Sequence, residues 1–408
     1  MKETRRIYLF FAVNILYSMA ASFAHPVTPT IIQQRGFGDY MFGVALGTQL
    51  AVNFLFSPFW GRLVNYLSSR RIILFCSLGY AAGQAMFGLA GSEAMMVAAR
   101  MFAGIFVGGV FTSLLTYIVN TSPETLRGQH LTVLATIQTV ASAFGYFAGG
   151  MLGEIGVGVT MTAQVVLLAV GGVLFYLVCQ DDAQTTLANV QPRALLREAN
   201  PVAALLAGRQ IMTPILACVF VISALANLGN NAFDQSFNYY LKAQLQLTSG
   251  YNGAIKAVIG LISLVTNGLI GMWLIKRTDI RRSTIYVYLG CAAATLGVVL
   301  LNSTVPFVIT SVIYFGFFAI SVPLTQSLAA VHARGGDSNL VMGFFNGLKA
   351  LGGIFGALAA GLLYTANPKW PFLLGFAAFA LSTLVSLRHY RLCQQQETGT
   401  AKSATVGV

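Results

Sequence analysis

The sequence predicts an all-α integral membrane protein whose twelve transmembrane helices form two six-helix bundles. Of the 408 residues, 56% are hydrophobic and only 9% are charged, whereas a soluble protein carries about 25% charged residues. Apolar stretches of about 20 residues, the length that crosses the hydrocarbon layer of a bilayer, recur along the whole chain. So few charges cannot cover a surface in water, and we expect much of the exterior to contact membrane lipid.

The first half of the chain contains six apolar runs, which predict an N-terminal six-helix bundle at residues 1–179. The first run is much longer than the apolar region of a signal peptide and has no convincing small-residue cleavage site. We therefore expect it to be a retained helix. The six expected spans lie at residues 7–32, 39–60, 72–91, 94–119, 129–153 and 158–179.

The second half repeats this plan after a polar interval, QDDAQTTLANVQPRALLREANPVAALLAGRQ, which we interpret as a cytoplasmic linker at residues 180–210. An expected C-terminal six-helix bundle follows at residues 211–390. The polar, small-residue tail at 391–408 has the composition of a disordered cytoplasmic segment. The expected spans of this bundle lie at residues 211–241, 249–275, 284–302, 304–331, 339–365 and 369–388.

The positions of lysine and arginine predict the orientation of the chain, because these residues are enriched in cytoplasmic loops. With the N-terminus inside, the cytoplasmic segments hold 18 of them, and the outer loops hold only Arg35, Lys242 and Lys369. We therefore expect a multi-pass protein of the inner (cytoplasmic) membrane with both termini in the cytoplasm. Twelve spans suffice for a monomer.

The sequence also excludes several function classes. Its net charge of +12 arises between the apolar runs rather than on a basic face of a soluble fold, so nucleic acid is not an expected partner. No zinc-protease HExxH, GxSxG or P-loop sequence is present, so we expect no enzyme and no ATP-driven pump in this chain. We also expect no cofactor and no metal, because the cysteines lack metal-ligand spacing and fit packing positions. The cysteines are Cys76, Cys179, Cys218, Cys291 and Cys393.

The two halves repeat weakly, as is typical of secondary transporters, whose substrate site lies between the repeats near the membrane midplane. GRLVNYLSSRR follows the second expected span and GMWLIKRTDIRR follows the eighth, and both end in paired arginines. GYFAGGMLG in the fifth span resembles GALAAGLLY in the eleventh. Aligning these two segments places Gln138 opposite Lys349.

The stretch GRLVNYLSSRR resembles the loop between the second and third helices of major facilitator superfamily transporters, which has glycine, an acid four residues later, and a basic cluster. Asn65 stands at the position of the usual Asp. The resemblance implies that the loop latches one conformational state, and the missing charge predicts a weaker or rearranged latch. The alternative is that the arginines only enforce topology. The gating loop comprises Gly61, Arg62, Asn65, Arg70 and Arg71.

A second resemblance lies in the fourth expected span, where Arg100-Met-Phe-Ala-Gly104 is similar to the Arg-x-x-x-Gly pattern of drug:proton antiporters in this superfamily. An arginine inside a span costs about 2.5–3.5 kcal/mol on insertion scales, so we expect Arg100 to face a polar cavity or partner. The alternative is that Arg100 extends to the outer interface. Gly104 and Gly108, one turn apart, predict a close helix crossing.

A third resemblance lies in the fifth expected span, where Gly145-Tyr-Phe-Ala-Gly149-Gly150 is similar to the antiporter pattern Gly-Pro-x-x-Gly-Gly. Tyr146 stands at the proline position. The pattern implies a close-packed, bendable helix at Gly145, Gly149 and Gly150. Together these motifs resemble the bacterial twelve-helix drug:proton antiporter type of the major facilitator superfamily.

Polar residues recur at helical spacing within the first, second and seventh expected spans, which favours a shared cavity. The alternative is that small polar groups join helices by hydrogen bonds, worth about 0.6 kcal/mol each on average. The candidate cavity residues are Asn14, Ser18, His25, Gln49, Asn53, Gln138, Asn227, Asn231, Asn346 and Lys349.

Few ionisable residues lie within the expected spans. Asp234 is a candidate proton carrier, because desolvation raises the pKa of a carboxyl group; a permanent ion pair with Lys256 is the alternative. Lys349 lies roughly 16 Å into its span at a rise of about 1.5 Å per residue, where no acid is expected. It is therefore predicted to attract an anionic substrate, or else to bond carbonyls or Asn346. We group Arg100, Asp234 and Lys256 as a proton-coupling or charge network.

Two functions remain open at this point. The first is a secondary transporter that works by alternating access and exports a drug-like or amphiphilic solute in exchange for protons. The alternative is an exchanger or symporter of organic anions or metabolites in which Lys349 and Arg100 bind the anion. The expected partners are a small-molecule substrate, protons and membrane lipid.

Overall fold

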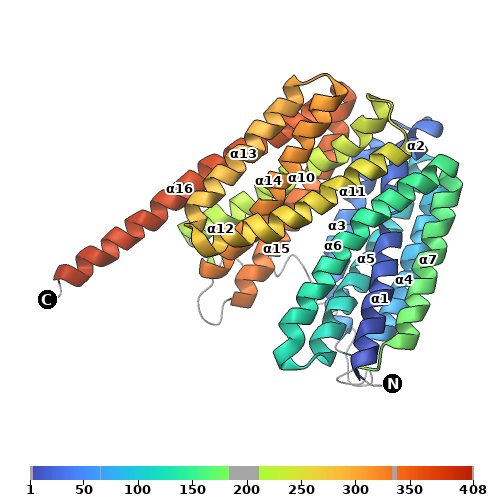
Figure 1. The fold of residues 1–408 in the computed structure, drawn as a ribbon, viewed down its shortest axis with the longest axis horizontal. Helices are drawn as coiled ribbons and strands as arrows, with labels where there is room; N and C mark the ends of the chain where they lie inside the picture. Colours follow the sequence, from blue (N-terminus) through green and yellow to red (C-terminus); the bar gives the residue numbers. More distant parts are fainter. Residues whose placement is uncertain (1–2, 65, 183–210, 333–337, 407–408) are drawn as a thin grey trace. The chain divides into compact units, whose positions relative to one another are not determined.

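The computed structural model describes residues 3–64, 66–182, 211–332 and 338–406 of the chain. Every regular element in these ranges is helical, and twelve helices are long and apolar enough to cross a membrane (Figure 1). The predicted all-α membrane fold and its twelve spans are therefore confirmed. The predictions for Asn65 and for linker residues 183–210 lie outside the described residues.

The first six spans are built from seven helices, because the first span is divided in two. Its break falls at Ser22 and Phe23 and is followed by Pro26, which lacks the N–H of a regular helix. The helices are α1 (Glu3–Ala21), α2 (Ala24–Gln34), α3 (Met41–Leu63), α4 (Ser69–Leu89), α5 (Glu93–Thr121), α6 (Glu124–Ile155) and α7 (Val157–Val178).

The last six spans include one that is not a regular α-helix throughout. The eighth span begins as α11, passes through the π-helix η3 and ends as α12; π-helical turns of this kind are frequent at functional sites. The elements are α10 (Pro214–Ala243), α11 (Ser249–Val265), η3 (Thr266–Gly271), α12 (Met272–Arg277), α13 (Ile280–Leu300), α14 (Thr304–His332), α15 (Ser338–Ala366) and α16 (Trp370–Val406).

The chain divides into two compact units whose boundaries differ from the predicted ones. Unit 1 joins Met1–Pro201 with Gln235–Leu261, and unit 2 joins Val202–Asp234 with Ile262–Val408. The segment Gln235–Leu261 belongs to unit 1 because its side chains bond there: Asn238 Nδ2, for example, donates to the carbonyl oxygen of His25 over 2.9 Å.

Glycines allow helices to approach closely inside each unit. In unit 1, a Cβ atom at Gly145 or Gly149 of α6 would clash with the carbonyl oxygens of Met19 and Phe23. In unit 2, Gly352 and Gly356 of α15 meet the carbonyl oxygens of Ala224 and Leu228 in the same way. Each unit therefore joins its first helix to its fifth through a pair of glycines one turn apart.

This packing corrects the predicted alignment of the two halves. Gly145 corresponds to Gly352 rather than to Gly356, a shift of four residues, or about one helical turn. In the corrected register Gln138 lies opposite Phe345 instead of Lys349. The sequence alignment was wrong because it matched runs of small residues, whereas the helix contacts select particular glycines among them.

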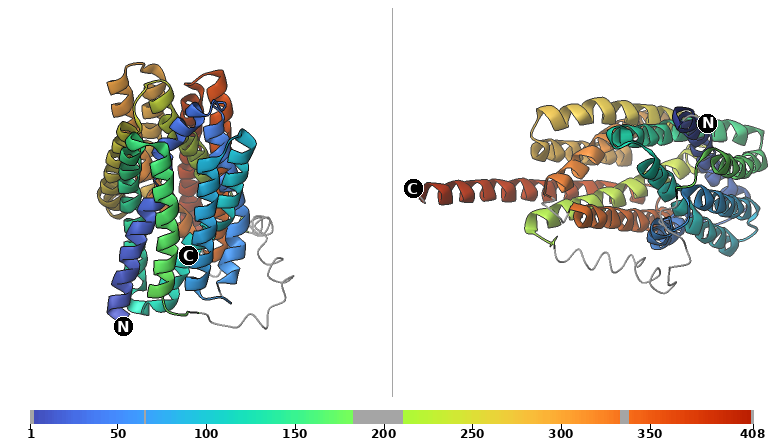
Figure 2. Two further views of the ribbon diagram at one scale, coloured as in Figure 1. Left: turned by 90° about the vertical axis from the view of Figure 1, so that its right-hand side faces the viewer. Right: turned by 90° about the horizontal axis from the view of Figure 1, so that it is seen from below.

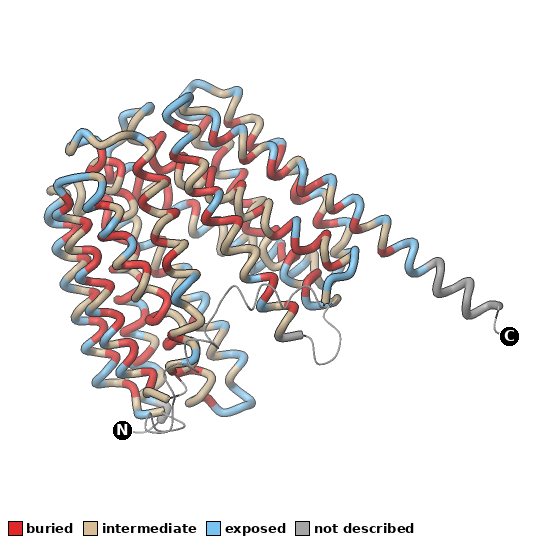
Figure 3. The backbone as a smooth tube through the Cα atoms, turned by 180° about the vertical axis from the view of Figure 1, so that it is seen from behind, coloured by how far each residue is buried: buried red, intermediate tan, exposed pale blue. Residues whose placement is uncertain are grey.

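Buried and exposed faces alternate along the helices of both units (Figure 3). In unit 1 the buried face carries aromatic side chains such as Phe10, Tyr17 and Phe175, which pack against one another. Large apolar side chains within the helices, among them Phe75 and Leu115, are exposed. An exterior of this kind is stable in lipid rather than in water.

The last helix is longer than the sequence predicted. α16 continues to Val406, so residues 391–406, which were expected to be disordered, are helical, and Figure 2 shows this part extending beyond the other helices of unit 2. No proline interrupts the segment, and Arg281 Nη1 lies 2.7 Å from Glu397 Oε1, which ties it to α13. The composition indicated low hydrophobicity but carried no information about this contact.

Candidate functional site

Arg100 is buried among the side chains of unit 1. Its side chain is 6% exposed, and Nη1 donates a hydrogen bond to Oε1 of Gln49 over 3.0 Å. The guanidinium carbon lies 3.6 Å from the ring centroid of Phe87, a cation–π contact. α3, α4 and α5 each supply one of these side chains, so the charge is held by an amide and an aromatic face.

Two glycines of α5 bring this arginine close to the polar face of α3. A Cβ atom at Gly104 would lie 2.7 Å from the carbonyl oxygen of Gln49, and one at Gly108 would clash with Asn53 Oδ1. Ser57 Oγ donates to the same Asn53 oxygen over 2.9 Å. In this structure Asn53 therefore lies at the contact between α3 and α5.

His25 lies beside Arg100 in unit 1. Both line a small cavity of about 20 Å³ together with Asn238 and Tyr239 of α10. The imidazole stacks on the ring of Tyr146, with centroids 5.1 Å apart and an interplanar angle of 16°. The structure thus places an imidazole on the same cavity as a buried cation.

Lys256 occupies an aromatic environment in unit 1. It is 6% exposed, and Nζ lies 5.3 Å from the ring centroid of Phe237 and 5.9 Å from that of Tyr146. Asp234 is half-buried and belongs to unit 2. The Asp234–Lys256 ion pair therefore stays a prediction.

Lys349 lies in unit 2, where it lines a cavity of about 30 Å³. Asn227 of α10, Asn346 of α15 and Tyr288 of α13 line the same cavity. The structure therefore gathers three of the candidate residues there: Asn227, Asn346 and Lys349. Serine, threonine, glutamine and apolar side chains form the rest of the described lining, which contains no carboxylate. Polar groups without negative charge thus surround the lysine.

Asn231 lies one turn beyond Asn227 and bonds within its own helix. Its Nδ2 donates to the carbonyl oxygen of Asn227 over 3.0 Å, and Asn227 Nδ2 donates to that of Ser223 over 2.9 Å. Asn231 also contacts α15, because a Cβ atom at Gly353 would lie 3.0 Å from its Nδ2. Asn231 therefore lies at the contact between α10 and α15 rather than in the lining around Lys349.

The remaining candidates differ in exposure. Asn14 and Ser18 are buried in α1, and neither the Asn14 amide nor the Ser18 hydroxyl has a hydrogen-bond partner among the described residues. A buried polar group without a partner costs about 1–3 kcal/mol, so such positions are suited to bond a bound solute or water. Gln138 is half-buried in α6. Gly150, a predicted helix-bending glycine of α6, packs against α11, because a Cβ atom there would clash with the carbonyl oxygen of Ser249.

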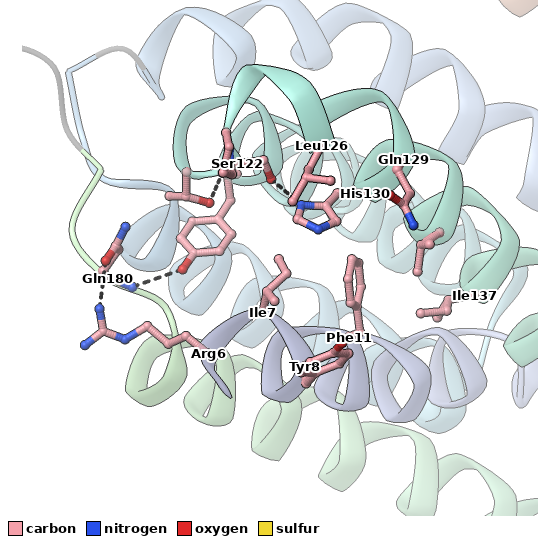
Figure 4. A pocket seen from close by; sticks show the side chains of 14 residues that line it. Arg6, Ile7, Tyr8, Phe11, Ser122, Leu126, Gln129, His130, Ile137 and Gln180 are labelled. Carbon is pink, nitrogen blue, oxygen red and sulfur yellow. Dashed lines mark hydrogen bonds between the residues drawn. The ribbon is translucent and has the colours of Figure 1, made fainter. Parts of the chain in front are cut away.

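A much larger cavity of about 590 Å³ opens in unit 1 between α1, the end of α5 and the start of α6 (Figure 4). Tyr8 and Phe11 point into it with several aliphatic side chains. Polar groups lie at its edges: Arg6 Nη1 donates to Gln180 Oε1 over 2.7 Å, and the Ser122 hydroxyl lies 2.8 Å from His130 Nδ1.

The sequence analysis did not identify this cavity. A signal was present, because residues of α6 that line it recur every three or four positions and so share one helix face. These are Leu126, Gln129, His130, Val133 and Ile137.

Acids that follow α7 pair with the predicted gating loop. Asp181 Oδ2 lies 2.9 Å from Arg70 Nη2 and 3.9 Å from Arg71 Nη2. Asp182 accepts hydrogen bonds from the backbone N–H and the hydroxyl of Ser69, over 2.7 and 2.6 Å, at the first residue of α4. The sequence analysis missed these two acids because it assigned them to the linker.

The remaining residues of the gating loop are Gly61, Arg62 and Asn65. Gly61 makes only ordinary van der Waals contact, since a Cβ atom there would lie 3.7 Å from Thr112. Arg62 is exposed, and Asn65 lies outside the described residues.

Comparison with known proteins identifies the family. A profile of the Major Facilitator Superfamily matches residues 10–357. The chain belongs to this superfamily. It is therefore a multi-pass transporter of small molecules rather than an enzyme.

Relatives and solved structures of this superfamily match almost the whole chain. Multidrug resistance protein 2 of Bacillus subtilis (strain 168) is 19% identical over 385 residues, covering 93% of both chains. Multidrug resistance protein 1 of the same organism is 19% identical over 379 residues, covering 89% of this chain and 90% of its own. A bacterial homolog of the human lysosomal transporter Spinster matches with a TM-score of 0.77 and 12% identity, covering 95% of this chain and 97% of that one.

Proposed function

We propose that this major facilitator superfamily transporter exports a drug-like or amphiphilic solute across the cytoplasmic membrane in exchange for protons. The observation that carries the proposal is the 590 Å³ cavity of unit 1. Its lining combines aromatic and aliphatic side chains with polar groups and the cation Arg6. Such a mixed lining binds amphiphilic molecules, and sites for drug-sized ligands measure about 300–1,000 Å³. The two Bacillus relatives named for multidrug resistance support the same proposal.

Two groups are candidates for proton carrier in this scheme. His25 lines a cavity with Arg100, and an imidazole can carry a proton, so a proton on His25 would change the charge balance around the buried arginine. Asp234 is the second candidate, since a carboxylate that moves between wet and dry surroundings changes its proton affinity. Neutral variants of each, His25→Gln and Asp234→Asn, separate the two in a proton-flux assay.

Alternating access requires contacts that break and re-form, and the segment Gln235–Leu261 supplies a set of them in unit 1. The hydroxyl of Tyr239 donates to Asp39 Oδ1 over 2.5 Å, and Asn252 Nδ2 donates to Asn238 Oδ1 over 2.6 Å. We assign these bonds to closure of the outer side of the transporter, with both chain ends in the cytoplasm. Cleavage of a terminal tag in inside-out but not in right-side-out vesicles tests this orientation, and light scattering of the purified protein tests the proposed monomer.

The pair Asp181–Asp182 suggests how the gating loop works without an acid at position 65. The acids bind Arg70 and the start of α4 from the chain that leaves α7. In this proposal the acid that latches the loop comes from the linker side, so that movement of the linker and movement of the loop are coupled.

A second candidate function is organic-anion or metabolite exchange or symport, and Lys349 favours it. Its described surroundings in unit 2 combine polar and apolar side chains without a carboxylate, so a bound carboxylate or phosphate would supply a counter-charge. In this scheme Arg100 binds the anion as well, and Lys349 supplies the specificity.

Uptake into proteoliposomes with independently set internal and external pH separates the two functions. For export of amphiphilic solutes, a lipophilic cationic dye moves against an imposed proton gradient, and Lys349→Gln leaves this movement largely intact. For anion transport, a small organic anion moves instead, and Lys349→Gln abolishes its movement. Lys369→Gln is the matched control, because Lys369 lines neither cavity; its Nζ donates to the carbonyl oxygens of Val298 and Leu301 and lies 4.9 Å from the ring centroid of Phe307. Movement of neither solute would overturn both proposals.

A further inference from the structure

Three side chains with metal-binding atoms converge in unit 2, and none of them lines a cavity described above. They are His332 at the end of α14, and His389 and Cys393 of α16. Their ligand atoms all lie within 4.8 Å of one another. His389 is 1% exposed and Cys393 is 4% exposed, whereas His332 is half-buried, so the cluster is shielded on one side and accessible through His332.

The spacing of the atoms agrees with a tetrahedral metal site. Zinc binds histidine nitrogen at about 2.0–2.1 Å and cysteine sulfur at about 2.3 Å. At the tetrahedral angle this places two nitrogens about 3.3 Å apart and a nitrogen and a sulfur about 3.6 Å apart. The observed separations are 3.2 Å between the Nε2 atoms of His332 and His389, and 3.7 Å between Cys393 Sγ and His389 Nε2.

The local structure holds these atoms in place. His389 and Cys393 are four residues apart on a continuous helix, a spacing that puts two ligands on one face as in helical zinc motifs. His332 comes from a different helix, so an ion here would cross-link α14 to α16. Arg281 interacts electrostatically with His389, but its charge is balanced by Asp279 at 3.2 Å and Glu397 at 2.7 Å.

We propose that His332, His389 and Cys393 form a binding site for a divalent transition-metal ion, best suited to zinc, with water in the fourth position. Two nitrogens and one thiolate are ligands of borderline softness, which favours zinc or cobalt over magnesium or calcium. None of the three residues lines a cavity proposed for solute binding, so this proposal does not depend on the proposed transport function.

Cobalt titration of the purified full-length protein, without a polyhistidine tag, tests the site directly. We expect one equivalent of Co²⁺ to bind with a thiolate-to-cobalt absorption band and the strong visible bands of tetrahedral cobalt, and Zn²⁺ to displace it. Cys393→Ser should remove the thiolate band, and His332→Gln should weaken binding by at least roughly tenfold. His130→Gln and Cys291→Ala serve as controls, because they remove a histidine and a cysteine that do not belong to the cluster.

A second measurement keeps the test independent of how the variants fold. X-ray absorption of the zinc-loaded wild-type protein should show one sulfur at about 2.3 Å and two nitrogens at about 2.0–2.1 Å. A shell of oxygen and nitrogen alone would overturn the proposal. So would stoichiometric cobalt binding that is unchanged in Cys393→Ser and His332→Gln, or no binding at all, which would leave the pair as a histidine–histidine hydrogen bond.

Discussion

Arg100 and Gln49 form a buried hydrogen bond between α5 and α3, with the arginine Nη1 donating to the glutamine Oε1 over 3.0 Å. A permanent charge inside a membrane protein is costly, and such residues mark substrate or ion pathways. The amide and the ring of Phe87 stabilise this charge without neutralising it. The surplus positive charge remains available to a solute or to a group that titrates nearby.

Replacing Arg100 should impair transport more than it impairs folding. Arg100→Gln leaves the Gln49 oxygen without its charged donor, at a cost of about 1–3 kcal/mol, and removes the cation from the cavity shared with His25. Arg100→Lys should not rescue activity, because an ammonium cannot reproduce the planar contact with Phe87. We expect a loss of initial transport rate of at least about tenfold in vesicles. Wild-type rates in both variants would contradict a role for the charge, and Arg277→Gln serves as the exposed control.

The glycine contact between α6 and α1 makes a stability prediction with an internal control. Gly145→Ala places a Cβ atom against the carbonyl oxygen of Met19 and should destabilise the protein by about 1–3 kcal/mol, the cost of overpacking. Gly128→Ala lies on the same helix with open space around it. It should be neutral or stabilising by up to about 1 kcal/mol, because alanine favours helix. Thermal unfolding in detergent measures both, and equal effects of the two variants would contradict the packing described.

Breaking the Tyr239–Asp39 bond should loosen the proposed outer closure. Tyr239→Phe removes only the donating hydroxyl. Thr28 lies on the nearby small cavity, so a cysteine introduced there by Thr28→Cys reports access to it. We expect this cysteine to react faster with a membrane-impermeant maleimide when Tyr239→Phe is also present than when Tyr239 is intact. Tyr40→Phe is the control, because the Tyr40 hydroxyl bonds Glu93 within the bundle instead. Equal reaction rates in the two backgrounds would exclude a closing role for the bond.

The two acids after α7 should differ in their contribution to stability. Asp182 bonds the first N–H of α4, and loss of such a cap costs about 1 kcal/mol. Asp181 forms partly exposed ion pairs, which are worth about 0–1 kcal/mol. Asp182→Ala should therefore lower the unfolding temperature more than Asp181→Ala does. The reverse order would show that the arginine pairs, rather than the helix cap, hold this loop.

Cys179 provides a local reporter of the same region. Burial is the main cause that raises the pKa of its thiol to about 12. A raised pKa keeps the thiol protonated at neutral and mildly alkaline pH, and the thiolate is the reactive form. We expect little alkylation of Cys179 below about pH 9 and faster alkylation in Asp182→Ala, as measured by peptide mass spectrometry. Rapid alkylation of the wild-type protein at pH 7 would contradict the burial seen here.

The sequence predicted the membrane fold well because hydropathy and span length constrain it almost completely. All twelve spans are present. The Arg-x-x-x-Gly motif also pointed to the glycines of α5, whose contacts with α3 the structure gives in detail. These features are local in sequence, so spacing alone reveals them.

Features that depend on contacts between distant segments were missed. The pairing of Asp182 with Ser69, the helix at 391–406 and the cluster of His332 with Cys393 each join residues far apart in the chain. The correspondence of Gln138 with Lys349 was wrong by one turn because small residues repeat along both helices. Periodicity identifies a helix face but does not determine which residue of another helix it meets.

The most direct test of the central claim is the direction of proton movement that accompanies solute movement. Proteoliposomes containing the transporter and a pH-sensitive dye are given a gradient of a lipophilic cation but no pH gradient. Proton-coupled export predicts that protons move opposite to the solute, and that His25→Gln or Asp234→Asn removes the proton signal. Proton movement in the same direction as the solute, or solute movement without any pH change, would contradict the account.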